Sequence, residues 1–256
     1  MVSVGVDVGS ISAKAVVMGV GGVLAADVML TGYNSRGAGR QVYERVLAAT
    51  DLRPEQVDRI VATGYGRNSI DFAHKAVTEI TCHAAGAYYL DAAVRTIIDI
   101  GGQDSKVIAL DAKGKVRDFA MNDKCAAGTG RFLEVMARAL ELDLDAFGDL
   151  SLAAERAAPI SSMCTVFAES EVISLIAKGE ERANIIAGIH AAIAARVAAM
   201  AKRVGLRPTV MMTGGVARNA GVVKALAAKL EIPLVVSEQA QVTGALGAAI
   251  LAAGLG

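Results

Sequence analysis

One strand–turn–strand pattern occurs twice in this chain and constrains its fold more than any other feature. The segments Asp7–Lys14 and Asp99–Lys106 both read Asp, aliphatic residue, Gly, four further residues and Lys. Short apolar runs typical of buried strands flank each of them. A long-period internal repeat carries information about the whole architecture. This one predicts two related halves, each of which presents a glycine turn and an aspartate to a shared cleft.

The repeated turn has the composition of a phosphate-binding loop. Glycine lets the backbone come close enough for main-chain N–H groups to face phosphate oxygens. An Asp at the end of a strand can hold Mg²⁺ through water, and Lys supplies a positive charge for phosphate. The alternative is a pair of ordinary hairpins, which does not explain why both Asp and Lys match. Neither copy is a Walker A loop, because the chain has no Gly-x4-Gly-Lys-Ser/Thr sequence.

A third glycine turn, Thr213-Gly214-Gly215, follows a buried strand and precedes a helix. In α/β folds this is a ligand-binding position, where glycine permits contact with a base or ribose. The alternative is a strand-to-helix turn that needs glycine only for its backbone. The first turn lacks the Gly-x-Gly-x-x-Gly spacing of a dinucleotide fingerprint, which argues against NAD.

The order of predicted elements is strand, strand, strand, helix and strand, twice over, which is typical of an α/β protein. The expected strands are a hairpin at 3–18 followed by 23–30, 57–62, 95–100, 106–110, 116–121, 209–212 and 234–236. The expected helices are 38–49, 79–92, 131–140, 166–178, 185–204, 222–230 and 243–253.

Composition excludes several classes of protein. Of 256 residues 54% are hydrophobic, which is ample for a core, and the formal net charge of zero gives no electrostatic footprint for nucleic acid or an anionic membrane. The apolar run 185–201 contains His190 and Arg196, so we expect a buried helix and no membrane span. The chain begins with a predicted strand and no export signal, and it has three cysteines. These features favour a cytoplasmic protein with thiols or metal ligands over disulfides.

Two of the cysteines lie just before predicted helices. Cys125 precedes the helix at 131–140 and Cys164 the helix at 166–178, where the positive end of a helix favours a thiolate or an anionic ligand. Two cysteines cannot complete a four-cysteine cluster site, although a symmetric dimer could supply four. The alternative is that both are small buried residues at helix ends. Cys82 is expected in the core.

Taken together, these motifs strongly resemble the activators of 2-hydroxyacyl-CoA dehydratases. The segments that carry the resemblance are Asp7–Ser10, Asp99–Lys106, Asn122–Phe132, Ser162–Ser170 and Met212–Asn219. The wider group includes the ATPase subunits of benzoyl-CoA reductase and the reductases of double-cubane cluster proteins. The resemblance runs from the first strand to the last helix, and the cysteine segments are specific to this group. The glycine turns alone indicate the broader actin-like ATPase superfamily, with sugar kinases and heat-shock chaperones.

The resemblance implies an actin-like (ribonuclease H-like) fold with ATP or ADP between two α/β domains, 1–93 with the helix at 241–256 packed back on it, and 94–240. It implies a homodimer with one [4Fe–4S] cluster held by Cys125 and Cys164 of each subunit. The implied ATP contacts are Gly9, Ser10, Ser12, Lys14, Gly101, Gly102 and Lys106 for the phosphates and Gly214, Gly215 and Asn219 for adenosine. Asp7 and Asp104 would lie near Mg²⁺, and Asp7, Asp104 and Gln103 would be the catalytic residues.

The implied activity is ATP-driven transfer of a low-potential electron, taken from ferredoxin or flavodoxin, to an iron–sulfur partner. The partner is expected to be a 2-hydroxyacyl-CoA dehydratase, with a double-cubane protein or a benzoyl-CoA-type reductase as alternatives. Movement of the second phosphate turn would reach Cys125 through one strand. Outside this group, a small-molecule kinase or an ATP-sensing regulator of the same superfamily is the rival interpretation.

Overall fold

The computed structural model describes residues 1–161 and 164–255, and its strands form two five-stranded sheets. The contacts divide the chain into two compact units. The first comprises Met1–Ile97, Leu110–Arg117 and the C-terminal segment from Gln241, and the second comprises Ile98–Ala109 and Asp118–Ala240. The domain boundaries drawn from the sequence stay a prediction.

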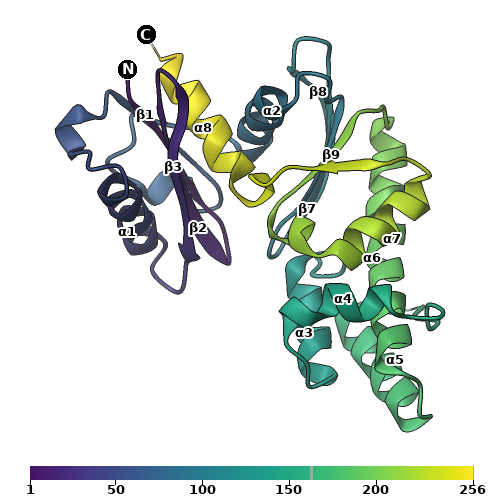
Figure 1. Cartoon of the computed structure of the whole chain (residues 1–256). Helices are drawn as coiled ribbons and strands as arrows, with labels where there is room; N and C mark the ends of the chain where they lie inside the picture. Colours follow the sequence, from purple (N-terminus) through teal and green to yellow (C-terminus); the bar gives the residue numbers. More distant parts are fainter. Residues whose placement is uncertain (162–163, 256) are drawn as a thin grey trace. The chain divides into compact units, whose positions relative to one another are not determined.

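The first sheet has the strand order β3-β2-β1-β4-β5 (Figure 1). Its strands are β1 (Ser3–Val8), β2 (Ser12–Gly19), β3 (Gly22–Leu30), β4 (Arg59–Thr63) and β5 (Lys75–Ala76). β1 pairs antiparallel with β2 and parallel with β4, while β2–β3 is antiparallel and β4–β5 parallel. In the β1–β2 register Asp7 lies directly opposite Lys14, so the hairpin itself brings these two residues together.

Three helices belong to this unit: α1 (Ser35–Ala48), α2 (Glu79–Leu90) and α8 (Thr243–Ala253). Helix α8 packs against α2, β1 and β4. This packing requires glycine, because a Cβ atom on Gly247 would lie 1.7 Å from the carbonyl oxygen of Cys82. Cys82 is fully buried there, and burial raises the pKa of its thiol to about 12. It is therefore a core residue.

The second sheet has the order β10-β9-β6-β7-β8. Its strands are β6 (Thr96–Ile100), β7 (Ser105–Leu110), β8 (Val116–Asn122), β9 (Val210–Thr213) and β10 (Leu234–Val236). When β1 to β5 are matched in turn with β6 to β10, the two sheets have the same strand order, and β9–β10 is parallel like β4–β5. The internal repeat seen in the sequence is therefore a repeat of topology.

The helices of the second unit separate its strands. Between β8 and β9 lie α3 (Gly130–Ala139), α4 (Phe147–Leu152), α5 (Thr165–Ala177) and α6 (Arg182–Val204), and between β9 and β10 lies α7 (Ala220–Leu230). The strands and helices expected from the sequence are confirmed with small shifts of their ends, whereas α4 and β5 were not expected. Ser162 and Met163, which belong to one motif of the resemblance, lie outside the described residues.

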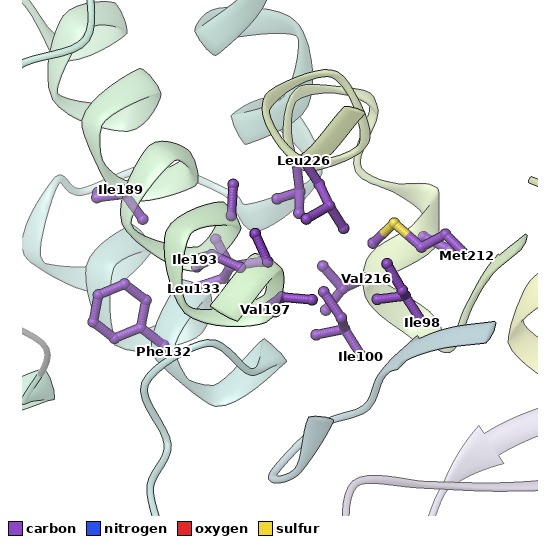
Figure 2. Close-up of a cluster of buried hydrophobic side chains, with 14 of the residues drawn as sticks. Ile98, Ile100, Phe132, Leu133, Ile189, Ile193, Val197, Met212, Val216 and Leu226 are labelled. Carbon is purple, nitrogen blue, oxygen red and sulfur yellow. The ribbon is translucent and has the colours of Figure 1, made fainter. Parts of the chain in front are cut away.

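The core of the second unit holds the end of β6 in place. Figure 2 shows its side chains converging from several elements. They include Ile98 and Ile100 of β6, Phe132 and Leu133 of α3, Ile189, Ile193 and Val197 of α6, Met212 of β9 and Leu226 of α7. Helix α6 is long and apolar enough to cross a membrane, but more than half of its most apolar stretch is buried in the protein. Burial in this core accounts for its composition.

Candidate functional site

The turn between β6 and β7 gathers three buried charged side chains. The ammonium nitrogen Nζ of Lys106 lies 3.3 Å from Oδ2 of Asp99 and 2.5 Å from Oδ2 of Asp104. Thr213, at the end of β9, donates its hydroxyl to Oδ1 of Asp99 at 3.1 Å. Two carboxylates and one ammonium thus lie together in a buried place. This arrangement suits a divalent cation with oxygen ligands.

Glycine is required where this turn begins. The N–H of Gly101 donates to the carbonyl of Asp104 at 2.9 Å and closes the turn. The carboxylate of Asp104 folds over the same residue, since a Cβ atom on Gly101 would lie 2.5 Å from Oδ1 of Asp104. Gly102 is half-buried and Gln103 is exposed at the tip. The tip is thus open to a ligand, while its base is fixed by the buried charges.

The turn between β1 and β2 repeats this geometry with one carboxylate fewer. The N–H of Gly9 donates to the carbonyl of Ser12 at 3.1 Å, and Nζ of Lys14 lies 3.3 Å from Oδ2 of Asp7. Ser12 stands at the position that Asp104 has in the second turn. The side chain of Lys14 is 15% exposed, against 3% for Lys106. The neighbouring Ser10 is half-buried.

A Thr-Gly pair closes the back of each turn. Gly214 has φ +86°, and a Cβ atom there would lie 2.4 Å from the carbonyl oxygen of Ile100 and 2.7 Å from Oδ1 of Asp99. Gly64 has φ +89°, and its Cβ would lie 2.4 Å from the carbonyl oxygen of Val8 and 2.6 Å from Oδ1 of Asp7. The sequence analysis identified Thr213-Gly214 as a ligand-binding turn and missed Thr63-Gly64. The signal was present, because Thr63-Gly64 also follows a buried strand.

Gly215 and Asn219, the other two residues expected near adenosine, lie in different local environments. A Cβ atom on Gly215 would meet no atom within 4 Å, so the space beside this residue can accept a ligand. Asn219 caps α7, since its Oδ1 accepts a hydrogen bond from the N–H of Val222 at 3.0 Å. The cap fixes where α7 begins relative to the glycine turn.

The loop that carries Cys125 is joined directly to the second turn. The N–H of Gly130 donates to the carbonyl of Gly101 at 2.9 Å, and the N–H of Arg131 donates to the carbonyl of Gly102 at 2.7 Å. These are the first residues of α3, the helix that follows the Cys125 loop. The sequence suggested a connection through β8, and the structure adds a shorter one through two main-chain hydrogen bonds.

Cys164 is the N-terminal cap residue of α5. Its carbonyl accepts from the N–H of Ala168 at 2.9 Å, and its side chain is exposed, while Cys125 is half-buried. Helix α5 packs against α3. The apolar side chains of Val166 and Phe167 in the first turn of α5 are 66% and 65% exposed. An exposed cysteine does not fit the alternative of a small buried residue at a helix end.

The donor set fits part of an iron–sulfur site. Within residues 1–161 and 164–255, no three His, Cys, Asp or Glu side chains gather as a metal-binding group. Thiolates are the usual ligands of an iron–sulfur cluster, and a helix N-terminus stabilises a thiolate. Cys125 and Cys164 therefore match half of the four-thiolate set, and a second copy of the chain could supply the other half.

Two glycine turns on topologically matched sheets define an ATPase of the actin-like and sugar kinase fold. The same fold is found in a ROK family glucokinase from Streptomyces griseus, at 17% identity and a TM-score of 0.58 over 99% of this chain and 100% of the other. A model of the BadF/BadG/BcrA/BcrD ATPase family matches residues 4–252. This chain belongs to that family.

Individual relatives are similar over nearly their whole length. The activator of lactoyl-CoA dehydratase from Anaerotignum propionicum is 52% identical over 253 residues, which cover 98% of this chain and 97% of the relative. The activator of 2-hydroxyisocaproyl-CoA dehydratase from Clostridium difficile, solved with bound ADPNP, has a TM-score of 0.94 at 44% identity. That match covers 98% of this chain and 94% of the other.

Proposed function

We propose that this ATPase activates an iron–sulfur partner enzyme, a 2-hydroxyacyl-CoA dehydratase, by passing it a low-potential electron from a [4Fe–4S] cluster. The observation that carries the proposal is the pair of hydrogen bonds from Gly130 and Arg131 to Gly101 and Gly102. They tie the turn expected to contact phosphate to the helix that follows Cys125. If nucleotide binding moves this turn, the two main-chain hydrogen bonds would transmit the movement directly to the start of α3 and to the loop before it.

The nucleotide part of the proposal assigns a role to each turn. Lys14, Lys106 and the main chain at Gly9, Gly101 and Gly102 would bind phosphates, and Ser10 and Ser12 would add hydroxyl contacts. Asp7 and Asp104 would hold Mg²⁺, and these carboxylates with Gln103 would orient the attacking water. Gly214, Gly215 and Asn219 would border adenosine. The two buried carboxylates beside Lys106 and the open space beside Gly215 support these roles.

The cluster part of the proposal needs a homodimer, with Cys125 and Cys164 of both subunits around one cluster. Such a cluster supplies one-electron transfer, with ferredoxin or flavodoxin as the donor to it. The exposed Cys164 beside the exposed Val166 and Phe167 supports this arrangement, because a second copy would cover the apolar side chains. The protein would work in the cytoplasm.

Coupling to ATP has an energetic reason. Lowering a one-electron potential by ~300 mV costs roughly 7 kcal/mol, at about 1.4 kcal/mol per 59 mV. ATP hydrolysis can supply a free energy of about this magnitude.

The coupling can be tested with spin labels on α3. If the second turn moves α3, labels on α3 of the two subunits should change their separation when ATP is added. Identical distance distributions with and without ATP would contradict the coupling.

The first test is anaerobic purification with iron and sulfide analysis and EPR spectroscopy of the dithionite-reduced protein. We expect about four irons per dimer, as one cubane in four thiolates requires. Cys125→Ser and Cys164→Ser should each lose the iron and the EPR signal, while the buried control Cys82→Ser should keep both. A colourless protein after strict anaerobic reconstitution would overturn the proposal and leave an ATPase without a cluster.

The partner is tested separately. A purified 2-hydroxyacyl-CoA dehydratase should become active only when this protein, ATP and a reductant are all present. Activation of a benzoyl-CoA-type reductase or reduction of a double-cubane protein, with no effect on the dehydratase, would change the partner and leave the mechanism in place.

A further inference from the structure

The side chain of Asn122 spans the loop that carries Cys125. Asn122 is the last residue of β8, and its Nδ2 donates to the carbonyl oxygens of Cys125 at 2.8 Å and Ala127 at 3.1 Å. One amide group thus fixes the backbone at the cysteine and two residues beyond it. The other bonds of the loop, from Thr129 to the carbonyl of Ala126 and from α3 to the second turn, lie after the cysteine.

Asn122 is itself held by Arg196 of helix α6. The Nη2 atom of Arg196 donates to Oδ1 of Asn122 at 3.2 Å. The aliphatic part of the arginine lies against the same loop, since a Cβ atom on Gly128 would lie 3.0 Å from Cδ of Arg196. Close to Arg196 on α6, Ile193 and Val197 are buried in the core. The loop is therefore connected, through two side chains, to a helix that contributes to the core of the unit.

We propose that Asn122 and Arg196 are positioning residues for Cys125: together they fix the direction of its backbone, and hence of its thiolate, toward the cluster. This inference rests on the proposed function, but no residue of the pair has a role in that proposal. The assignment also explains a charge that composition alone leaves unexplained. Arg196 is the only Lys, Arg, Asp or Glu between Arg182 and Lys202 of α6, and its bond to Asn122 gives this charge a role at the loop.

The pair predicts two separable effects. Asn122→Ala and Asn122→Asp both remove the donors to the Cys125 and Ala127 carbonyls, but the Asp variant keeps an acceptor for Arg196. If the donors matter, both variants should loosen the loop, whereas a role in pairing Arg196 alone would spare the Asp variant.

The second effect concerns the charge of Arg196. Arg196→Met removes the positive charge near the loop and Arg196→Lys keeps it. Since cluster potentials depend on nearby charge, Arg196→Met should give a more negative midpoint potential than Arg196→Lys.

The experiment that does not depend on the cluster is hydrogen exchange of the full-length chain in its cluster-free form, with alkylation of Cys125 in a Cys82→Ser, Cys164→Ser background. Loss of two hydrogen bonds should speed amide exchange at 123–129 and alkylation of Cys125 by about tenfold or more in both Asn122 variants. Arg203→Met, an exposed arginine near the end of α6, and Asn184→Ala, an asparagine of the same helix bonded elsewhere, are the matched controls.

Two results would overturn the positioning role. One is unchanged exchange and alkylation at the loop in Asn122→Ala and Asn122→Asp. The other is faster exchange that extends equally to β6 and β9, which would indicate general destabilisation. Because both readouts use protein without a cluster, they keep their meaning even if the iron analysis rules out the proposed function.

Discussion

The two halves of this protein use the same turn, but they surround its lysine differently. Lys14 faces one carboxylate and is partly exposed, whereas Lys106 faces two and is buried. The difference comes from one position, Ser12 in the first turn and Asp104 in the second. The first turn therefore pairs its lysine with one carboxylate, and the second pairs its lysine with two. The comparison teaches that a single substitution in a duplicated turn can change the number of carboxylates that surround its lysine.

The halves also differ in what they insert after the third strand. Between β3 and β4 the structure has the α-helix α1, whereas the described residues between β8 and β9 include α3 to α6, with Cys125 and Cys164. The second turn has main-chain bonds to the first helix of this insertion, through Gly130 and Arg131. Both candidate cluster cysteines thus belong to the half whose turn carries the additional carboxylate.

Replacing the lysine of each turn should give the largest difference between the two halves, measured as loss of unfolding free energy. Lys106→Met leaves Asp99 and Asp104 buried without their common cation, and removal of one partner of a buried ion pair costs about 3–5 kcal/mol. Lys14→Met leaves one partly solvated carboxylate and should cost about 1–3 kcal/mol. Urea unfolding of both variants without nucleotide measures the difference. Equal losses would show that the second carboxylate makes no difference to the folded state.

Replacing the matched glycines should show where the halves are alike. Gly64→Ala and Gly214→Ala both place a side chain at positive φ and within 2.4 Å of a carbonyl oxygen. We expect similar losses of about 2–4 kcal/mol for the two variants, from backbone strain and overpacking together. The same unfolding experiment measures them, with Gly215→Ala, which meets no neighbour, as the control. A loss confined to one variant would contradict the structural equivalence of the two Thr-Gly pairs.

Exchanging the residues that distinguish the turns should test their roles in catalysis. Asp104→Ser should lower ATP hydrolysis by about 100-fold or more, the scale on which loss of a general base acts. Ser12→Asp should not restore activity to that variant, because it places the carboxylate beside Lys14 and not beside Lys106. Steady-state ATPase assays at several Mg²⁺ concentrations provide the measurement. Full activity of the single variant Asp104→Ser would remove Asp104 from the catalytic and Mg²⁺ sites.

Acid should weaken the second half through a histidine. His190 on α6 is buried, its Nδ1 lies 3.0 Å from Oγ of Ser151, and burial lowers its pKa to about 4. Between that value and the ordinary pKa near 6.5 the unfolded chain binds a proton that the folded chain does not. Stability should therefore fall as pH falls, by about 2 kcal/mol from pH 7 to pH 5. Urea unfolding should show this loss in the parent protein and not in His190→Gln, and parallel pH profiles would contradict it.

The fold could be predicted well from the sequence because the repeat consists of short local patterns. Alternation of apolar residues, glycine at the turns and the Asp–Lys match are all read within eight residues, as at Asp7–Lys14. The register of β1 and β2, which places Asp7 opposite Lys14, comes from the structure. Helix α4 was missed because it has six residues, one of them Gly148, and so carries too little periodicity to be recognised.

The connections within the candidate site could not be predicted in the same way. The bond between Arg196 and Asn122 joins residues that are 74 positions apart, and nothing in either local pattern indicates the other. The bonds from α3 to Gly101 and Gly102 are made by main-chain atoms, so they cannot be recognised from the residue types in the sequence. The equivalence of Gly64 and Gly214 was readable in principle. It was missed because the segments that follow the two strands differ.

Because the bonds between α3 and the second turn use only backbone atoms, they are insensitive to most amino-acid substitutions. Every residue except proline offers the same N–H at position 131, so a screen of ordinary point mutations would leave this connection untouched and invisible. Substitutions on the outer surface of α3 therefore leave the two bonds in place. The surface of this helix can change while its connection to the second turn is kept.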